Sequence, residues 1–311
     1  KLVLSGEYAV LAGAKALVAA VDRRVVCLLH RRNEADWSFK SRGYFFESSH
    51  TVDELFRDLP DEDPARFIAH LSTPNALPRH AAVTIDSSPF YLHKQKLGIG
   101  SSAAVTVALG NALAALDGHE MGVERLQQAH RTFQRGVGSG LDVAAAYRGG
   151  VILYQNNQAE THGIDPNVHY GFVFAGESTQ TPRMIARFNE WRGETTPTSL
   201  AELVSTANGV VEASLQANAF MSCMKDYIGA LVQLDQDAQI GIFGPGHKAA
   251  MGLAERHGVL YKPCGAGGGD MGVAFSTEDG ALTRFKRDVE EQGLNVVRLE
   301  IADDGVQVRT G

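Results

Sequence analysis

Glycine gathers in three short segments of this 311-residue chain, and these segments restrict its fold more than any other feature. They lie at residues 98–100, 136–140 and 265–272. The first two lead into runs of small residues with helical character, and the third leads into an apolar run typical of a strand. Glycine lets the backbone turn sharply and approach other atoms closely. The pattern therefore predicts loops that hold a ligand at the ends of helices and strands.

Size and charge limit the classes of function. A mass of 33.4 kDa fits two domains that share a cleft, and 44% hydrophobic with 21% charged residues is typical of a globular protein. The net charge of −7 argues against nucleic acid and against an anionic membrane as partners. We therefore expect a small-molecule substrate. The chain has three cysteines, an odd number, and their spacing is not that of metal ligands. This indicates a reducing, cytoplasmic location.

Strands and helices alternate in both halves of the chain, which predicts an α+β class. Residues 101–116 are small and apolar all round, so we expect a buried helix that packs closely on a sheet. The polar segment 155–167 suits a link between domains, which we place at residues 1–160 and 161–311. We expect a final strand at residues 296–301 and then a hairpin through Asp304-Gly305.

The segment Lys96 to Ala104 is the best candidate for an anion site. Its glycines precede a helix start, where converging N–H groups and the helix dipole favour a negative charge. The hydroxyls of Ser101 and Ser102 suit a phosphate oxygen or a magnesium ion. The spacing is neither that of a Walker A loop nor that of the dinucleotide fingerprint. The alternative is a plain glycine turn in which a serine caps the helix.

The other two segments have structural alternatives as well. Residues 136–146 are a glycine loop that feeds a small-residue helix with Asp142 in its first turn, where a carboxylate also serves as a cap. Residues 262–272 contain more glycine than a hairpin turn needs, which favours close contact with a ligand. A mobile surface loop is the alternative there.

Three motifs, in this order, resemble those of the GHMP kinases. The first is residues 1–10, the second residues 98–104 and the third residues 265–272. The resemblance implies the GHMP kinase fold, with an N-terminal ribosomal-protein-S5-like α+β domain that holds the ATP loop. It also implies a C-terminal ferredoxin-like α+β domain with the acceptor-side glycine loop, and an active site in the cleft.

Within the superfamily, the sequence is most similar to the phosphomevalonate kinases. The similar segments are Gly-Glu-Tyr-Ala-Val at residues 6–10, residues 137–144, residues 180–185 and the loop at 264–272. Two residues of that loop differ from the family pattern: Cys264 replaces a serine and Met271 a cysteine. Arg131 stands where mevalonate kinases have a magnesium-binding glutamate, eleven residues before the aspartate, so the acidic metal ligand stays unassigned.

The resemblance implies ATP and Mg²⁺ as cofactors, (R)-5-phosphomevalonate as acceptor, and a role for each matching residue. The implied catalytic residues are Lys1 and Asp142; the ATP-binding residues are Lys96, Gly98, Gly100, Ser101, Ser102 and Ala103, with Ser102 also on Mg²⁺; the substrate-binding residues are Glu7, Tyr8, Gly138, Ser139, Gly265, Ala266, Gly267, Gly268 and Asp270. Cations near the motifs are candidates for the acceptor phosphate: His93, Lys94, Lys96, Arg131, Arg135, Arg183 and Lys262.

Other functions stay open. A kinase for mevalonate or another small alcohol, and the related decarboxylase of the isoprenoid route, would share the fold. A ligand-sensing regulator built on an inactive kinase would have little reason to keep Lys1, Ser102 and Asp142 together. We expect a monomer or a homodimer.

Overall fold

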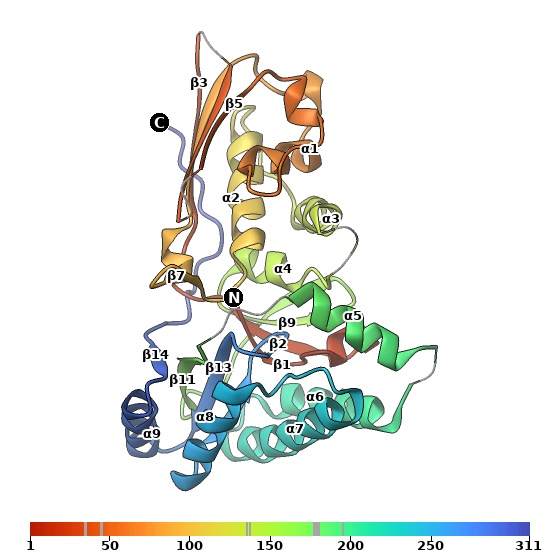
Figure 1. Ribbon diagram of the computed structural model, residues 1–311, viewed down its shortest axis with the longest axis vertical. Coiled ribbons are helices and arrows are strands. Elements are labelled where there is room, and N and C mark those ends of the chain that lie inside the picture. The colour runs from red at the N-terminus through yellow and green to blue at the C-terminus, as the bar shows by residue number, and fades with distance from the viewer. Residues whose placement is uncertain (34–35, 44–45, 135, 137, 177–180, 195) are drawn as a thin grey trace. The chain divides into compact units, whose positions relative to one another are not determined.

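The computed structural model describes residues 1–33, 36–43, 46–134, 136, 138–176, 181–194 and 196–311, which form two compact units (Figure 1). Unit 1 consists of residues 1–22, 97–99 and 149–303, and unit 2 of residues 23–96, 100–148 and 304–311. Each unit is therefore assembled from segments far apart in the sequence. The division expected between residues 160 and 161 falls inside a strand of unit 1 and does not coincide with these units.

The first sheet of unit 1 is antiparallel and has the strand order β1-β2-β9-β10. Its strands are β1 (Leu2–Ser5), β2 (Ala16–Ala19), β9 (Val151–Gln155) and β10 (Gln158–His162). The polar segment 155–167 thus contains a strand and does not link two units. Asn156 and Asn157 both adopt positive φ, at 51° and 64°, which makes the tight two-residue turn of a hairpin.

The second sheet of unit 1 is also antiparallel, with the order β12-β13-β11-β14. Its strands are β11 (His169–Phe174), β12 (Leu260–Pro263), β13 (Met271–Ser276) and β14 (Asn295–Val297). The helices of the unit are α5 (Thr181–Arg192), α6 (Thr198–Ala213), α7 (Ala217–Ala238), α8 (Pro245–Arg256) and α9 (Asp279–Glu291). Apolar residues of α8 and α9 pack with Val173 and Ala274 of the sheet to form one buried core.

Unit 2 contains a sheet with the order β3-β6-β4-β5, in which only the β4–β6 pair among the described strands is parallel. Its strands are β3 (Val26–Arg31), β4 (Trp37–Arg42), β5 (Phe46–His50) and β6 (Ala81–Asp86), with a separate hairpin of β7 (Tyr91–Leu92) and β8 (Gln95–Lys96). The helices are α1 (Ile68–Leu71), α2 (Ser101–Ala115), α3 (Val123–Phe133) and α4 (Leu141–Arg148). Short 3₁₀ helices occur at Glu54–Phe56, Pro64–Phe67, Pro74–Ala76 and Ser88–Phe90 here, and at Ala9–Ala12 in unit 1.

Helix α2 is buried, as its composition predicts. It runs beside the sheet of unit 2 (Figure 1), and its valines and leucines share a core with Trp37 and Phe39. A Cβ built on Gly110 would lie 2.4 Å from Leu126 of α3, so the small residue permits a close helix contact. This helix sets the position of Ser101 and Ser102 at its first turn.

The predicted hairpin through Asp304-Gly305 is wrong. The described residues after the bridge at Ile301 contain no strand. Arg24 donates hydrogen bonds to the carbonyls of Asp304 and Gly305, and the Val306 N–H donates to the Tyr147 carbonyl. These contacts use backbone groups that a hairpin would pair, so the segment packs against Arg24 and Tyr147 instead.

Candidate active site

Lys1 precedes β1 and brings parts of the three motifs together within unit 1. Its backbone nitrogen donates a hydrogen bond to the Ile99 carbonyl over 2.8 Å. A Cβ built on Gly265 would lie 3.8 Å from Lys1 Nζ, so the ammonium group lies beside the Gly265 backbone. The first motif, residues 97–99 and the third motif therefore meet at one place.

Gly98 completes this meeting point. It adopts φ +72°, and a Cβ on it would lie 2.5 Å from Asp270 Cγ. The carboxyl group of Asp270 thus occupies the space that a side chain at position 98 would need. Asp270 is itself buried, and its carbonyl accepts a hydrogen bond from the Ala175 N–H over 3.0 Å.

The start of α2 in unit 2 has the features of an anion site. Gly100 adopts a left-handed conformation, with φ 85° and ψ 40°, and precedes the first helical residue, Ser101. The N-cap residue is Gly100, which has no side chain, so the alternative of a serine at the N-cap is not what the structure contains. The first N–H groups of α2 and its dipole are thus oriented toward an anion. Ala103 is fully buried, so only its backbone can contribute to such a site.

Ser102 is half-buried and has a partner that the sequence analysis missed. Its Oγ lies 3.1 Å from Nε2 of His130, a residue of α3 that is 4% exposed. His130 directly precedes Arg131, the residue that stands where mevalonate kinases have a glutamate. This position next to a family motif is the sequence feature that could have indicated His130.

Asp142 is the second residue of α4 and is half-buried. The helix dipole favours a carboxylate in this first turn. The preceding Gly140 carbonyl accepts hydrogen bonds from the Ala144 N–H over 3.1 Å and from Gln127 Nε2 over 3.3 Å. Gly138 and Ser139 are half-buried in the same loop, while residues 135 and 137 lie outside the described part of the chain.

The C-terminal glycine loop, residues 264–270, is held against a neighbouring turn of unit 1. The Gly268 N–H donates to the Ile242 carbonyl over 2.7 Å, and a Cβ on Gly267 would lie 2.5 Å from that carbonyl oxygen. Asp235 fixes the turn itself, because its carboxylate accepts hydrogen bonds from the N–H groups of residues 241, 242 and 243 over 2.7–3.0 Å. Sequence reasoning missed Asp235, although its partners are only 6–8 residues further along the chain.

Cys264 opens this loop in place of a serine and is buried. Burial raises the pKa of its thiol to about 12, so the thiol is protonated at neutral pH. The residue acts here as a small apolar side chain.

Glu7 and Lys262 form an ion pair whose side chains are 1% and 0% exposed. Lys262 Nζ donates to Glu7 Oε1, to the Pro263 carbonyl over 2.9 Å and to the Val3 carbonyl over 3.3 Å. Tyr227 OH donates to Glu7 Oε2 over 2.6 Å, and burial raises the pKa of this phenol well above its usual value. Lys262 is therefore an internal charge and not a surface cation near the acceptor.

Tyr8 is the centre of a tight turn. It adopts φ 58° and ψ −42°, and the Ala9 N–H donates across it to the Glu7 carbonyl. Such a γ-turn with positive φ is strained for a residue with a side chain, at a cost of about 1–3 kcal/mol. The side chain is 5% exposed, and its OH donates to the Ala266 carbonyl over 2.7 Å. Burial raises the pKa of the phenol, so it stays a donor.

His247, on α8, lies behind the same loop and is fully buried. Its Nδ1 lies 2.9 Å from Tyr261 OH, and among the described residues no partner lies within hydrogen-bond distance of Nε2. Burial, and then the charge of Lys262, lower the pKa of His247 to about 4. The ring is therefore neutral at pH 7.

The other candidate cations are on the surface of their units. His93, Lys94 and Lys96 are exposed at the β7–β8 hairpin, Arg183 is exposed on α5, and Arg131 is half-buried on α3. Arg135 lies outside the described residues.

In the part of the chain that the structure describes, no helix is long and apolar enough to span a bilayer.

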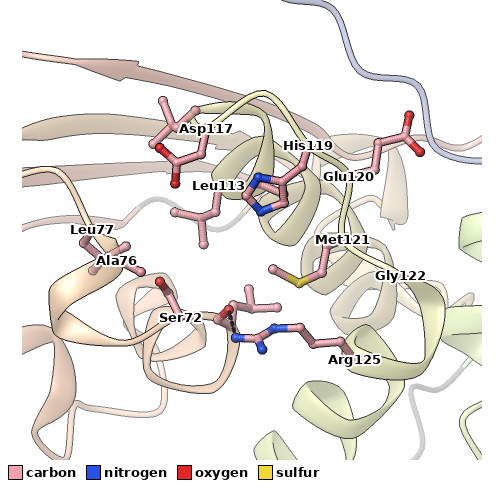
Figure 2. Close-up of a pocket in the computed structure, with 13 residues that line it drawn as sticks. Ser72, Ala76, Leu77, Leu113, Asp117, His119, Glu120, Met121, Gly122 and Arg125 are labelled. Atoms are coloured by element: carbon pink, nitrogen blue, oxygen red, sulfur yellow. Dashed lines mark hydrogen bonds between the residues drawn. The ribbon is translucent and has the colours of Figure 1, made fainter.

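A cavity of about 290 Å³ lies in unit 2, away from the motif residues of that unit. Leu113, Met121 and Arg125 line it, and Arg125 donates a hydrogen bond to the Leu71 carbonyl over 3.1 Å (Figure 2). The cavity lies at the C-terminal end of α2, whereas Ser101 is at the N-terminal end. The two ends of this 15-residue helix are about 22 Å apart. The cavity is therefore separate from the predicted phosphate site.

Comparison with known proteins identifies the fold. Residues 66–150 match the family described as the GHMP kinases N terminal domain. A solved structure, the Streptococcus pneumoniae phosphomevalonate kinase in complex with phosphomevalonate and AMPPNP, has a similar fold. The alignment covers 96% of this chain and 97% of the chain of that kinase. The TM-score is 0.80 at 19% sequence identity. The chain has the GHMP kinase fold.

Two curated relatives extend the similarity over almost the whole chain. The phosphomevalonate kinase of Streptomyces sp. (strain CL190) is 28% identical over an alignment of 367 positions, which covers 98% of this chain and 96% of the relative. The phosphomevalonate kinase of Saccharolobus solfataricus is 24% identical over 330 residues, which cover 100% and 97%. The GHMP kinase motifs predicted from the sequence thus lie in a chain that aligns with these relatives over nearly its whole length.

Proposed function

We propose that this GHMP-fold protein is a phosphotransferase that transfers a phosphoryl group from ATP to (R)-5-phosphomevalonate, giving 5-diphosphomevalonate and ADP. The observation that carries the proposal is the position of Lys1 beside Gly265, next to the contact of Gly98 with Asp270. Residues at the start, in the middle and near the end of the sequence converge there. The names of the two full-length relatives support the choice of acceptor.

The residues at the start of α2 fit the phosphates of ATP. Gly100 turns the backbone into the helix and brings no capping side chain, and the first N–H groups and the dipole favour an anion. Ser101 and Ser102 add hydroxyls, and Lys96 is a nearby cation in the sequence. We assign ATP binding to residues 96–103 on this ground.

The start of α2 also suits Mg²⁺, but the described residues supply few ligands for the ion. Mg²⁺ is usually held by one or two carboxylates together with phosphate oxygens and waters, not by an all-protein cage. Among the described residues, no group of three or more His, Cys, Asp or Glu is placed to hold a metal ion. We therefore assign to the protein the hydroxyl of Ser102 and no further ligand. The ion would neutralise charge between the phosphates.

The acceptor determines what Lys1 and Asp142 do. A phosphate monoester has a second pKa near 6, so its attacking oxygen is mostly deprotonated at pH 7.5. A general base then has little proton to remove, and Asp142 acts mainly by holding its neighbours and the acceptor in place. Lys1 supplies positive charge where negative charge develops during transfer. Ser139, Gly138 and residues 265–270 line the acceptor side in this proposal.

The test is release of ADP with three acceptors: mevalonate, its 5-phosphate and its 5-diphosphate. We expect turnover with the 5-phosphate to exceed that with the other two by at least about a hundredfold, since discrimination by a missing charged partner is large. Faster turnover of mevalonate would make the protein a mevalonate kinase. Turnover of the 5-diphosphate would indicate the decarboxylase, and no turnover with any acceptor would favour the inactive sensor. The Lys1→Met variant is the control for contaminating kinases.

A further inference from the structure

Lys262 has no N–H group left for a substrate, and Glu7 is buried with both of its carboxylate oxygens already bonded inside the protein. The three acceptors around Lys262 Nζ use all three of its N–H groups. Each carboxylate oxygen of Glu7 already accepts a hydrogen bond, and its side chain is 1% exposed. To reach an acceptor, either residue would have to break a buried ion pair and leave its partner uncompensated, which is strongly unfavourable.

The same pair joins two segments that carry the proposed chemistry. Lys262 is on β12, two residues before the C-terminal glycine loop begins, and it binds the Val3 carbonyl of β1 as well as Glu7. Tyr227, on α7, donates to Glu7 and accepts from the Gly6 N–H over 3.0 Å. The strand that follows Lys1 and the strand that leads into the loop are thus connected by buried charge-assisted hydrogen bonds.

Tyr8 makes a second connection, to the loop itself. Tyr8 is at the centre of the γ-turn, and its phenol donates to the Ala266 carbonyl. The ring packs on Phe188 of α5, with 5.1 Å between ring centroids. A residue in a strained backbone conformation persists only where the surroundings hold it, and such residues cluster at functional sites.

We propose that Glu7 and Tyr8 are positioning residues, which hold the C-terminal glycine loop in register with Lys1, and that neither of them binds the acceptor. The glycines of the loop provide close approach but no stiffness of their own, because glycine loses more conformational freedom on ordering than any other residue. The Tyr8–Ala266 and Glu7–Lys262 contacts supply the missing order. This inference rests on the proposed function only where it concerns the acceptor.

The first test uses Tyr8→Phe, which removes one hydroxyl and keeps the ring. The control is Tyr154→Phe, which removes the hydroxyl of another buried tyrosine of unit 1, bonded to Asn157 at the β9–β10 turn. Without any ligand, we expect amide hydrogen exchange in residues 264–270 to be about tenfold faster in Tyr8→Phe. That is the effect of losing about 1.4 kcal/mol from local opening. Tyr154→Phe should match the wild type.

The second readout of the same variants is kinetic. We expect Tyr8→Phe to raise KM for 5-phosphomevalonate about tenfold while kcat falls less than about threefold, because the loop must be reordered before the acceptor binds. A raised KM with unchanged exchange would show that Tyr8 contacts the acceptor directly, and would overturn the proposal. Unchanged KM or unchanged exchange in an active enzyme would overturn it too. If the wild type does not phosphorylate this acceptor, the proposed function fails, while the exchange experiment still tests the connection.

A double-mutant cycle tests Glu7. We expect Glu7→Gln to raise KM and loop exchange in the wild-type background and to add less than about twofold in a Lys262→Met background, because Glu7 acts through Lys262. Equal effects of Glu7→Gln in both backgrounds would indicate a direct contact with the acceptor and overturn the proposal. If Lys262→Met alone fails to fold, Tyr227→Phe is the second background, because it removes the other donor to Glu7.

Discussion

Behind the C-terminal glycine loop, Glu7 and Lys262 are almost fully buried, whereas Ser102 and Asp142 in unit 2 are only half-buried. The first region is rigid because charges and carbonyls bond one another across segments of unit 1. The second presents a helix start whose N-cap residue, Gly100, supplies no side chain. The difference suits the two tasks that we propose: the buried groups hold a loop in place through internal bonds, and the half-buried groups are partly accessible to a substrate.

The largest effect should come from charge at the reacting phosphoryl group. Lys1→Met should lower kcat by about 10²–10³-fold, the loss typical of removing one stabilising donor. Asp142→Asn should lower it less than Lys1→Met, because a phosphate acceptor needs little help from a base. The measurement is turnover at pH 7.5 with both substrates saturating. If Asp142→Asn costs more than Lys1→Met, then Asp142 is a true base and an alcohol acceptor is favoured.

A pair of glycine variants compares the packing of the two loops. Gly267→Ala should lower the free energy of unfolding by about 2–5 kcal/mol, since it combines a left-handed conformation with a clash against the Ile242 carbonyl. Gly136→Ala should cost about 1–2 kcal/mol, because φ is +85° there but no described atom lies within 4 Å of the added carbon. Urea denaturation of both variants measures the difference. Equal losses would mean that the two loops are equally tightly packed.

His247 makes the rigid region sensitive to acid. Its pKa is about 4 in the folded state, below an unfolded value of about 6.5. The unfolded state therefore binds the proton first, and stability present above pH 6.5 is lost as the pH falls toward 4. Between pH 7.5 and pH 5 the wild type should lose about 2 kcal/mol more than His247→Asn, as measured by urea denaturation at both values. The same loss in both proteins would assign the acid sensitivity to other groups.

The smallest effect should be at the start of α2. Ser102→Ala should raise KM for ATP by about three- to tenfold, which corresponds to one hydrogen bond, with an unchanged thermal melt. Ser49→Ala, at an exposed position of β5 in the same unit, should behave as the wild type. Wild-type affinity for ATP in Ser102→Ala would exclude the assignment of this hydroxyl and would leave the helix N–H groups as the phosphate site.

Features determined within a short window of sequence were predicted well. The small residues of 101–116 specify a buried helix, and α2 spans Ser101–Ala115. The helix starts and strands around the glycine motifs follow from the same local patterns. The hairpin turn at Asn156-Asn157 was missed, although asparagine pairs are a known signal for left-handed turns. The segment was interpreted from its polarity, which a solvent-facing hairpin shares with a linker.

Features that depend on distant residues were not predictable. Lys262 was interpreted as a candidate cation for the acceptor phosphate, because nothing near it in the sequence shows that Glu7, 255 residues away, is its partner. Asp235 bonds a turn only 6–8 residues further on, but the packing of the loop at 264–270 against that turn involves residues distant in the sequence. Asp304-Gly305 has the composition of a hairpin turn, but the contacts of Arg24 and Tyr147 determine its conformation.

The ion pair of Glu7 and Lys262 also has a consequence for the order of events during synthesis. The two residues are 255 positions apart, so at 5–20 residues per second the ribosome adds Lys262 roughly 10–50 s after Glu7. During that interval β1 has neither its ammonium partner nor β12, and Glu7 must remain in water. Residues 23–96 and 100–148, which pack mainly with one another, are complete long before. The part of unit 2 made of these residues can therefore form on the nascent chain first, while residues 304–311 of that unit are added last and β1, which follows Lys1, waits for β12.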